Sequence, residues 1–191
     1  ADLNEAIALD PNYEDAYLHR GSIRHDHFGD LEGVMEDFNN AVALNAKSAY
    51  ALHDRGLLKA RLGDTDGALE DFNSALQIDP KMMSAQHQIG LTKLKRRDVE
   101  GALEAYSAVL AHDPDDVVAL ANRGMLAMNH HKDFDAAKVD FDRAIAVNAN
   151  SYHALGARGI LCATQFGDME QALRDLKDAS ELQPEDATIH N

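Results

Sequence analysis

Arginine and aspartate recur in this chain at a fixed separation. An arginine is followed by an aspartate 16 or 17 residues later in four places: Arg20 with Asp37, Arg55 with Asp71, Arg123 with Asp140 and Arg158 with Asp175. At a fifth, equivalent place the arginine is replaced by Ile89, and the aspartate is replaced at the same time by Ala105. Because both charges are lost together, the pattern favours structural salt bridges. Binding of an anionic ligand by the arginines is the alternative.

The ten histidines and the single cysteine do not form a recognisable reactive site. His25 and His27, like His130 and His131, lie beside acidic residues, but a metal site needs three or four converging ligands. Cys162 lies in an apolar run, which is typical of a small buried side chain. The sequence has no phosphate-binding loop and no H-E-x-x-H motif. We therefore expect no catalytic residue, no cofactor and no metal site in this chain.

The charge balance excludes some classes of partner. The chain carries 33 acidic residues against 18 basic ones, a net charge of −15. Nucleic acids and anionic membranes are bound mainly through lysine and arginine, so neither is an expected partner. No run of 18 apolar residues is present, so no membrane span is expected. The lone cysteine weakly favours a reducing compartment such as the cytoplasm.

The elements that must position these residues repeat along the chain. Glycines at intervals of 34 or 35 residues mark the period: Gly21, Gly56, Gly90, Gly124 and Gly159. Each is followed 16 or 17 residues later by a large apolar residue: Phe38, Phe72, Tyr106, Phe141 and Leu176. A small residue stands four places before that large residue, and a second one three places after it. Spacings of three and four predict helices, so each unit is expected to be a helix, a turn and a second helix.

The turns are marked by glycine and by acidic residues. Gly63 and Gly167 are expected to end a first helix, and the acidic residue that follows suits the start of the next helix. Asp-Pro at 79–80 and 113–114 is expected to close a second helix. Three units have the longer spacing of 17, which predicts one extra residue late in the first helix or its turn, near residues 25–28, 130–132 and 164–166.

This arrangement resembles the tetratricopeptide repeat family over essentially the whole chain. The resemblance implies an all-α fold, a right-handed superhelical solenoid of antiparallel helix hairpins. The expected units are 1–13 (second helix of a truncated repeat), 14–48, 49–82, 83–116, 117–151 and 152–186 (repeats 1 to 5), and 187–191 (start of a further repeat). The sequence departs from the common pattern before the anchor glycine, where arginine replaces leucine, and three residues after it, where Arg24, Lys59, Lys93, Ala127 and Cys162 replace tyrosine.

In this family the first helices line a concave groove that holds partners, and the resemblance implies the same here. The groove residues that we expect to contact a partner are Tyr50, His53, Leu57, His87, Leu91, Leu94, Lys95, Val118, Met125, Met128, His153 and Ile160. The alternative is that the apolar members of this set pack against neighbouring helices. A basic cluster at Lys93–Arg97 favours a solvated helix end, with an acidic partner segment as the alternative.

These observations predict a protein-interaction scaffold that binds a peptide or helix of another protein without catalysis. Two alternatives remain open. The chain is the recognition or assembly arm of a larger enzyme or secretion machine, or it is a structural module that associates end to end. Both ends are expected to fall inside repeats, which would leave apolar surface for such stacking.

Overall fold

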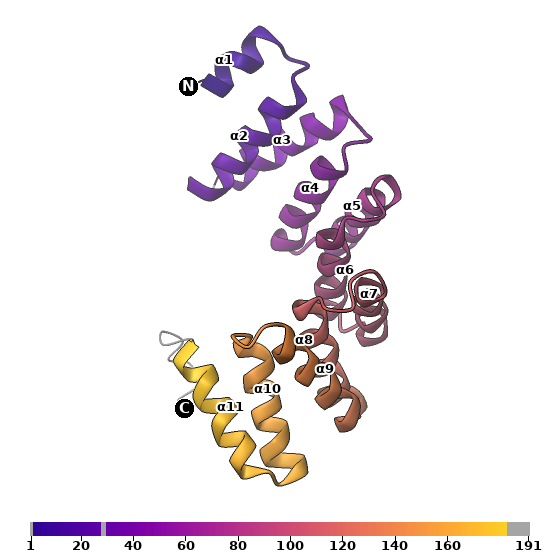
Figure 1. Ribbon diagram of the computed structural model, residues 1–191. Coiled ribbons are helices and arrows are strands. Elements are labelled where there is room, and N and C mark those ends of the chain that lie inside the picture. Colours follow the sequence, from indigo (N-terminus) through magenta and orange to yellow (C-terminus); the bar gives the residue numbers. More distant parts are fainter. Residues whose placement is uncertain (1, 28–29, 183–191) are drawn as a thin grey trace. The chain divides into compact units, whose positions relative to one another are not determined.

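The computed structural model describes residues 2–27 and 30–182, and these residues form helices joined by short turns (Figure 1). The chain divides into two compact units, Ala1–Asp98 and Val99–Asn191. Within the described part, no helix is both long enough and apolar enough to cross a membrane. The prediction of an all-α fold of sequential helix hairpins is confirmed.

The first unit contains six helices in the described residues. They are α1 (Asp2–Leu9), α2 (Glu14–His27), α3 (Leu31–Leu44), α4 (Ala49–Leu62), α5 (Thr65–Ile78) and α6 (Met83–Lys95). Each helix packs against the next one along the chain, most extensively within the pairs α2–α3 and α4–α5. These two pairs are the hairpins expected of repeats 1 and 2.

The second unit continues the pattern. Its α-helices are α7 (Val99–His112), α8 (Val117–Leu126), α9 (Phe134–Val147), α10 (Tyr152–Leu161) and α11 (Met169–Leu182). Two π-helical turns, η1 (Ala127–His131) and η2 (Cys162–Phe166), extend α8 and α10. The pairs α8–α9 and α10–α11 pack as hairpins, and α7 and α9 contact the helix that follows each.

The two π-helical turns explain the longer spacing in these repeats. A π-helical turn accommodates one residue more than an α-helical turn, because its hydrogen bonds reach one residue further. Both turns lie where the sequence predicts an extra residue, near 130–132 and 164–166, so this prediction is confirmed there. The third predicted insertion, near residues 25–28, falls partly outside the described residues.

The anchor glycine allows the two helices of a hairpin to approach closely. A Cβ atom on Gly56 would lie 2.7 Å from Cε1 of Phe72, and the same distance separates a Cβ on Gly124 from Cε1 of Phe141. Both phenylalanines are fully buried. The aromatic ring of the second helix therefore occupies the space that any larger side chain would need at the glycine.

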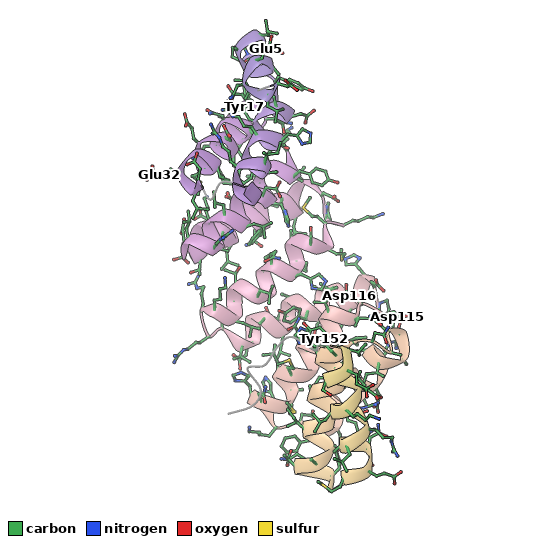
Figure 2. All side chains as sticks on the ribbon, turned by 90° about the vertical axis from the view of Figure 1, so that its left-hand side faces the viewer. Glu5, Tyr17, Glu32, Asp115, Asp116 and Tyr152 are labelled. Carbon is green, nitrogen blue, oxygen red and sulfur yellow. The ribbon has the colours of Figure 1, made fainter. Side chains whose placement is uncertain are left out.

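The turns and helix starts are made by the residues that the sequence marks for them. Gly63 and Gly167 have positive φ, as expected for glycines that end a first helix. Asp64 and Asp133 cap the following helices, and their carboxylates accept hydrogen bonds from the backbone N–H of Gly67 at 2.9 Å and of Ala136 at 3.0 Å. Asp116, labelled in Figure 2, caps α8 in the same way.

Candidate functional site

The structure brings the arginine and aspartate of each predicted pair together. The closest Nη2–Oδ1 distances are 2.5 Å for Arg20–Asp37, 2.7 Å for Arg55–Asp71, 2.7 Å for Arg123–Asp140 and 2.8 Å for Arg158–Asp175. In every pair the arginine Nε also donates to the same carboxylate. All four aspartates are buried, whereas the arginines keep part of their side chain in solvent. Each pair links the first helix of a hairpin to the second.

These contacts stabilise the charged form of all four arginines. Hydrogen bonds to the paired aspartates raise the pKa of Arg20, Arg55, Arg123 and Arg158, and outweigh the lowering effect of burial. The guanidinium charge is already matched by a buried carboxylate in each case. At Arg123 and Arg158, where no second cation binds the same aspartate among the described residues, this arrangement leaves little attraction for an anionic ligand.

Three of the arginines also bridge to the preceding repeat. Their Nη1 donates to a side-chain oxygen 16 residues earlier, on the preceding second helix: Arg20 to Asn4 at 2.7 Å, Arg55 to Asn39 at 3.3 Å and Arg158 to Asp142 at 2.7 Å. The residue at this position before Arg123 is Ser107. In the described part of the chain, Arg123 hydrogen-bonds Asp140 alone.

A second cation joins the pair in the first unit, which the sequence analysis did not predict. Arg24 Nη1 lies 2.9 Å from Asp37 Oδ2, and Lys59 Nζ lies 2.9 Å from Asp71 Oδ2. Both cations stand three residues after the anchor glycine, where the sequence departs from the family pattern. That departure is the signal that could have identified them.

The predicted groove residues of the first unit lie on α4 and α6, at different depths. Tyr50 is the most open, with 71 % of its surface exposed, and Leu91 and Lys95 are also exposed. Leu57, Leu94 and His87 are half-buried. His53 turns partly inward: its ring centroid lies 5.9 Å from that of Phe72, and its Nδ1 lies 3.0 Å from Asp54 Oδ1.

The predicted groove residues of the second unit lie on α8, η1 and α10. Val118 is 56 % exposed and Ile160 is 51 % exposed, and Met125 is also open to solvent. Met128 is half-buried, and the exposed His153 stacks on Tyr152 with 3.9 Å between ring centroids. Each unit therefore presents large apolar side chains on its first helices.

Two members of the basic cluster form ion pairs inside the first unit. Lys93 pairs with Asp98 at 3.1 Å, and Arg96 pairs with Asp66. Lys59, in the repeat before, is already bound to Asp71. Lys95 and Arg97 are exposed, so part of the positive charge stays open to solvent, and the solvated helix end and the acidic partner segment both stay predictions.

Two further observations concern metal ligands and the cysteine. Among the described residues, no three His, Cys, Asp or Glu side chains are grouped closely enough to hold a metal ion. Burial raises the pKa of the Cys162 thiol, so the reactive thiolate is disfavoured.

Comparison with known families decides the classification. A family model described as "Tetratricopeptide repeat" matches residues 49–82, and a second model with the same description matches residues 87–137. The chain is a tetratricopeptide repeat protein. No curated protein matches the sequence.

Solved structures of tetratricopeptide repeat proteins have the same fold. PilF of Pseudomonas aeruginosa matches with a TM-score of 0.83 at 17% identity, over 96% of this chain and 82% of that one. YrrB, described as "a TPR protein with an unusual peptide-binding site", matches with a TM-score of 0.73 at 19% identity, over 97% and 94%. MamA from Desulfovibrio magneticus RS-1 matches with a TM-score of 0.74 at 20% identity, over 91% and 97%. At these identities the matches establish the fold alone.

Proposed function

We propose that this tetratricopeptide repeat protein is an interaction scaffold that binds a peptide or helix of a partner protein on the first helices of its repeats, without catalysis. Repeats of this family are typically protein–protein interaction modules. The first-helix surface is defined here, separately for each unit, by the exposed apolar residues at the predicted groove positions. These are Tyr50 and Leu91 in the first unit, and Val118, Met125 and Ile160 in the second.

The observation that carries the proposal is the repeated exposure of large apolar side chains at equivalent positions. Tyr50 and Val118 both stand six residues before the anchor glycine, and Leu91, Met125 and Ile160 all stand one residue after it. Apolar groups gathered on a surface gain free energy when a partner covers them. Methionine adds adaptability, because its side chain is flexible and polarisable.

The chemistry of this surface fits an amphipathic helix or an extended apolar peptide. Such ligands dock through a row of apolar side chains. This mode of recognition needs few charged contacts. Of the charged groups near this surface, Lys95 is exposed, and its Nζ lies 3.5 Å from the carbonyl oxygen of Ala60. YrrB, a structural neighbour, is described as having a peptide-binding site, which agrees with this use of the fold.

Replacing Leu91 and Met125 together with aspartate is expected to abolish capture of the partner from a lysate of the source cells. Two charges placed on an apolar interface must be desolvated on binding, which costs several kcal/mol. Both side chains are about two-fifths exposed, so the chain is expected to remain folded. The measurement is a pulldown with quantitative mass spectrometry, and folding is checked by circular dichroism.

A matched control places the same charges on second helices. Leu44 and Val147 are exposed apolar residues at equivalent positions of α3 and α9, one in each unit. The double variant Leu44→Asp with Val147→Asp should leave capture unchanged. Loss of capture in this control, with normal capture by the first-helix variant, would move the binding site to the second helices.

A further inference from the structure

In repeats 1 and 2, the residue three places after the anchor glycine takes the same position beside the buried aspartate. From there, Arg24 and Lys59 place a cation 2.9 Å from Oδ2 of the buried aspartate of the hairpin. The same cations also lie near a backbone carbonyl at the start of the second helix, at 3.1 Å from Gly33 O for Arg24 and 3.4 Å from Gly67 O for Lys59. Each buried aspartate of these two hairpins thus binds two cations.

In the fourth repeat, the residue three places after the anchor glycine has no long side chain. Ala127 stands three residues after Gly124, and Ala136 corresponds to Gly33 and Gly67. The side chain of Asp140 is 8 % exposed, and among the described residues it binds one cation, Arg123. In the fifth repeat the corresponding residue is Cys162, but Asp175 there receives a third hydrogen bond, of 2.7 Å from Gln171 Nε2, besides the two from Arg158.

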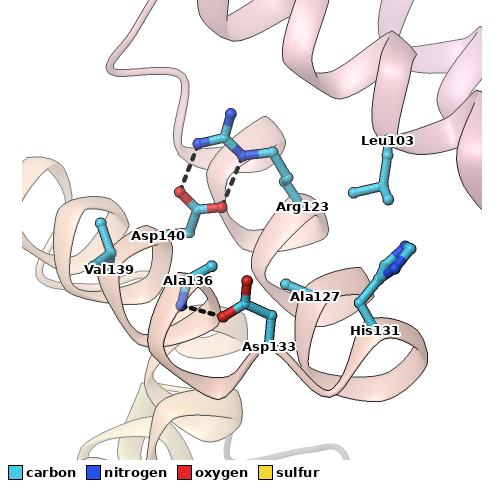
Figure 3. Close-up of a pocket in the computed structure, with 8 residues that line it drawn as sticks. All are labelled: Leu103, Arg123, Ala127, His131, Asp133, Ala136, Val139 and Asp140. Carbon is cyan, nitrogen blue, oxygen red and sulfur yellow. Dashed lines mark hydrogen bonds and ion pairs between the residues drawn. The ribbon is translucent and has the colours of Figure 1, made fainter.

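A pocket of about 420 Å³ lies where the second cation is missing. Figure 3 shows Asp133 and Asp140 on one side, with Leu103 and His131 across from them and Ala127 between. Two carboxylates and one guanidinium, that of Arg123, line the pocket, so a further positive charge would be favoured. Leu103, Ala127 and Val139 supply apolar surface for the methylene groups of a long basic side chain.

We propose that this pocket binds a lysine or arginine side chain of a partner protein. The ammonium or guanidinium group donates to Asp140, as Lys59 and Arg24 do to the equivalent aspartates, and Asp133 adds attraction at the pocket. The net charge of −15 favours basic partners over long range. The pocket residues are separate from the first-helix surface, so this contact exists whether or not that surface binds a peptide.

Small cations test the site directly. Butylammonium and ethylguanidinium, titrated into isotopically labelled protein and followed by NMR, are expected to give saturable shifts at Ala127, Ala136 and Asp140. Tetramethylammonium carries the same charge but has no N–H donor, and is expected to give no such shift. Equal shifts with tetramethylammonium would show diffuse charge attraction and overturn the proposal. The absence of saturable shifts with both donor cations would also overturn it.

Two substitutions test the position three residues after the anchor glycine: one fills it in the fourth repeat, and the other empties it in the second repeat. Ala127→Lys supplies the missing cation from within the chain and should weaken butylammonium binding by roughly tenfold or more, the effect of losing a hydrogen bond to a charged group. Lys59→Ala should open an equivalent pocket in the first unit, with new shifts at Gly67 and Asp71. Unchanged butylammonium binding in the Ala127→Lys variant would contradict the proposal. If the Ala127→Lys variant folds poorly, the Lys59→Ala variant tests the proposal independently, and the absence of new shifts at Gly67 and Asp71 would contradict it.

A capped lysine tripeptide distinguishes a protein side chain from a free amine. We expect acetyl-Gly-Lys-Gly-amide to give the same shifts as butylammonium, and acetyl-Gly-Gln-Gly-amide to give none. Binding of butylammonium without binding of the lysine peptide would contradict a partner-protein ligand and indicate a small amine instead.

Discussion

Replacement of Arg123 with alanine is expected to lower the free energy of unfolding by about 3 kcal/mol. Asp140 would lose the guanidinium that donates to both of its oxygens at 2.7 and 2.8 Å, while its carboxylate stays buried. A mostly buried charge without a partner is strongly unfavourable, because water solvates it only in part. This expected loss lies at the low end of the range for breaking a buried ion pair, because the Arg123 side chain is 33 % exposed. Denaturant unfolding followed by circular dichroism measures the change.

The double change Arg123→Ile with Asp140→Ala should be far milder, at about 1 kcal/mol or less. The third repeat carries this apolar combination naturally, as Ile89 and Ala105. Removing both charges leaves no group that needs a partner, so the pair is replaced rather than broken. Equal losses in the single and double variants would show that the arginine acts through packing and not through its pairing with Asp140.

Replacement of Gly124 with leucine is expected to destabilise the protein by about 3 kcal/mol. A Cβ at this position would lie 2.7 Å from Cε1 and 3.0 Å from Cδ1 of Phe141, and leucine adds three more carbons. The phenylalanine is fully buried, so its ring has no free space into which to move. The hairpin of α8 and α9 must then open, and thermal unfolding should report a clear drop in midpoint.

The same substitution at Gly156 provides the matched control. This glycine lies in α10, and a Cβ there would meet no atom within 4 Å. Leucine should therefore be tolerated, with a gain of up to about 1 kcal/mol from its higher helix propensity. A large loss at Gly156, or no loss at Gly124, would contradict the explanation of the anchor glycines by contact with the second helix.

Much of the fold could be predicted from the sequence because repeated units carry repeated constraints. The anchor glycine of a repeat marks the place where an aromatic ring of the second helix, such as that of Phe72, packs directly against the first helix. The Arg–Asp separation predicts contacts across the hairpin, since both residues recur and disappear together. A 17-residue spacing predicts an extra residue, which the π-helical turns at Ala127–His131 and Cys162–Phe166 accommodate.

Other features of the site could not be predicted because they depend on how far a side chain reaches. In the sequence, Arg24 and Lys59 are only departures from the family pattern. The structure shows that their side chains contact Asp37 and Asp71. The pocket beside Ala127 follows from the same cause, because it is the space that those longer side chains fill elsewhere. His53 stands at a groove position, yet its ring packs near Phe72, which helical spacing alone does not determine.

The first-helix surface as the partner-binding face is tested most directly by site-specific photocrosslinking. A photoreactive benzoylphenylalanine is placed singly at Leu91 and Met125 on first helices, and at Leu44 and Val147 on second helices. All four residues are exposed, so each probe reaches solvent. We predict that irradiation in a lysate of the source cells joins the same partner to positions 91 and 125 and leaves positions 44 and 147 uncoupled. Coupling of that partner to positions 44 and 147 alone would contradict the proposed function.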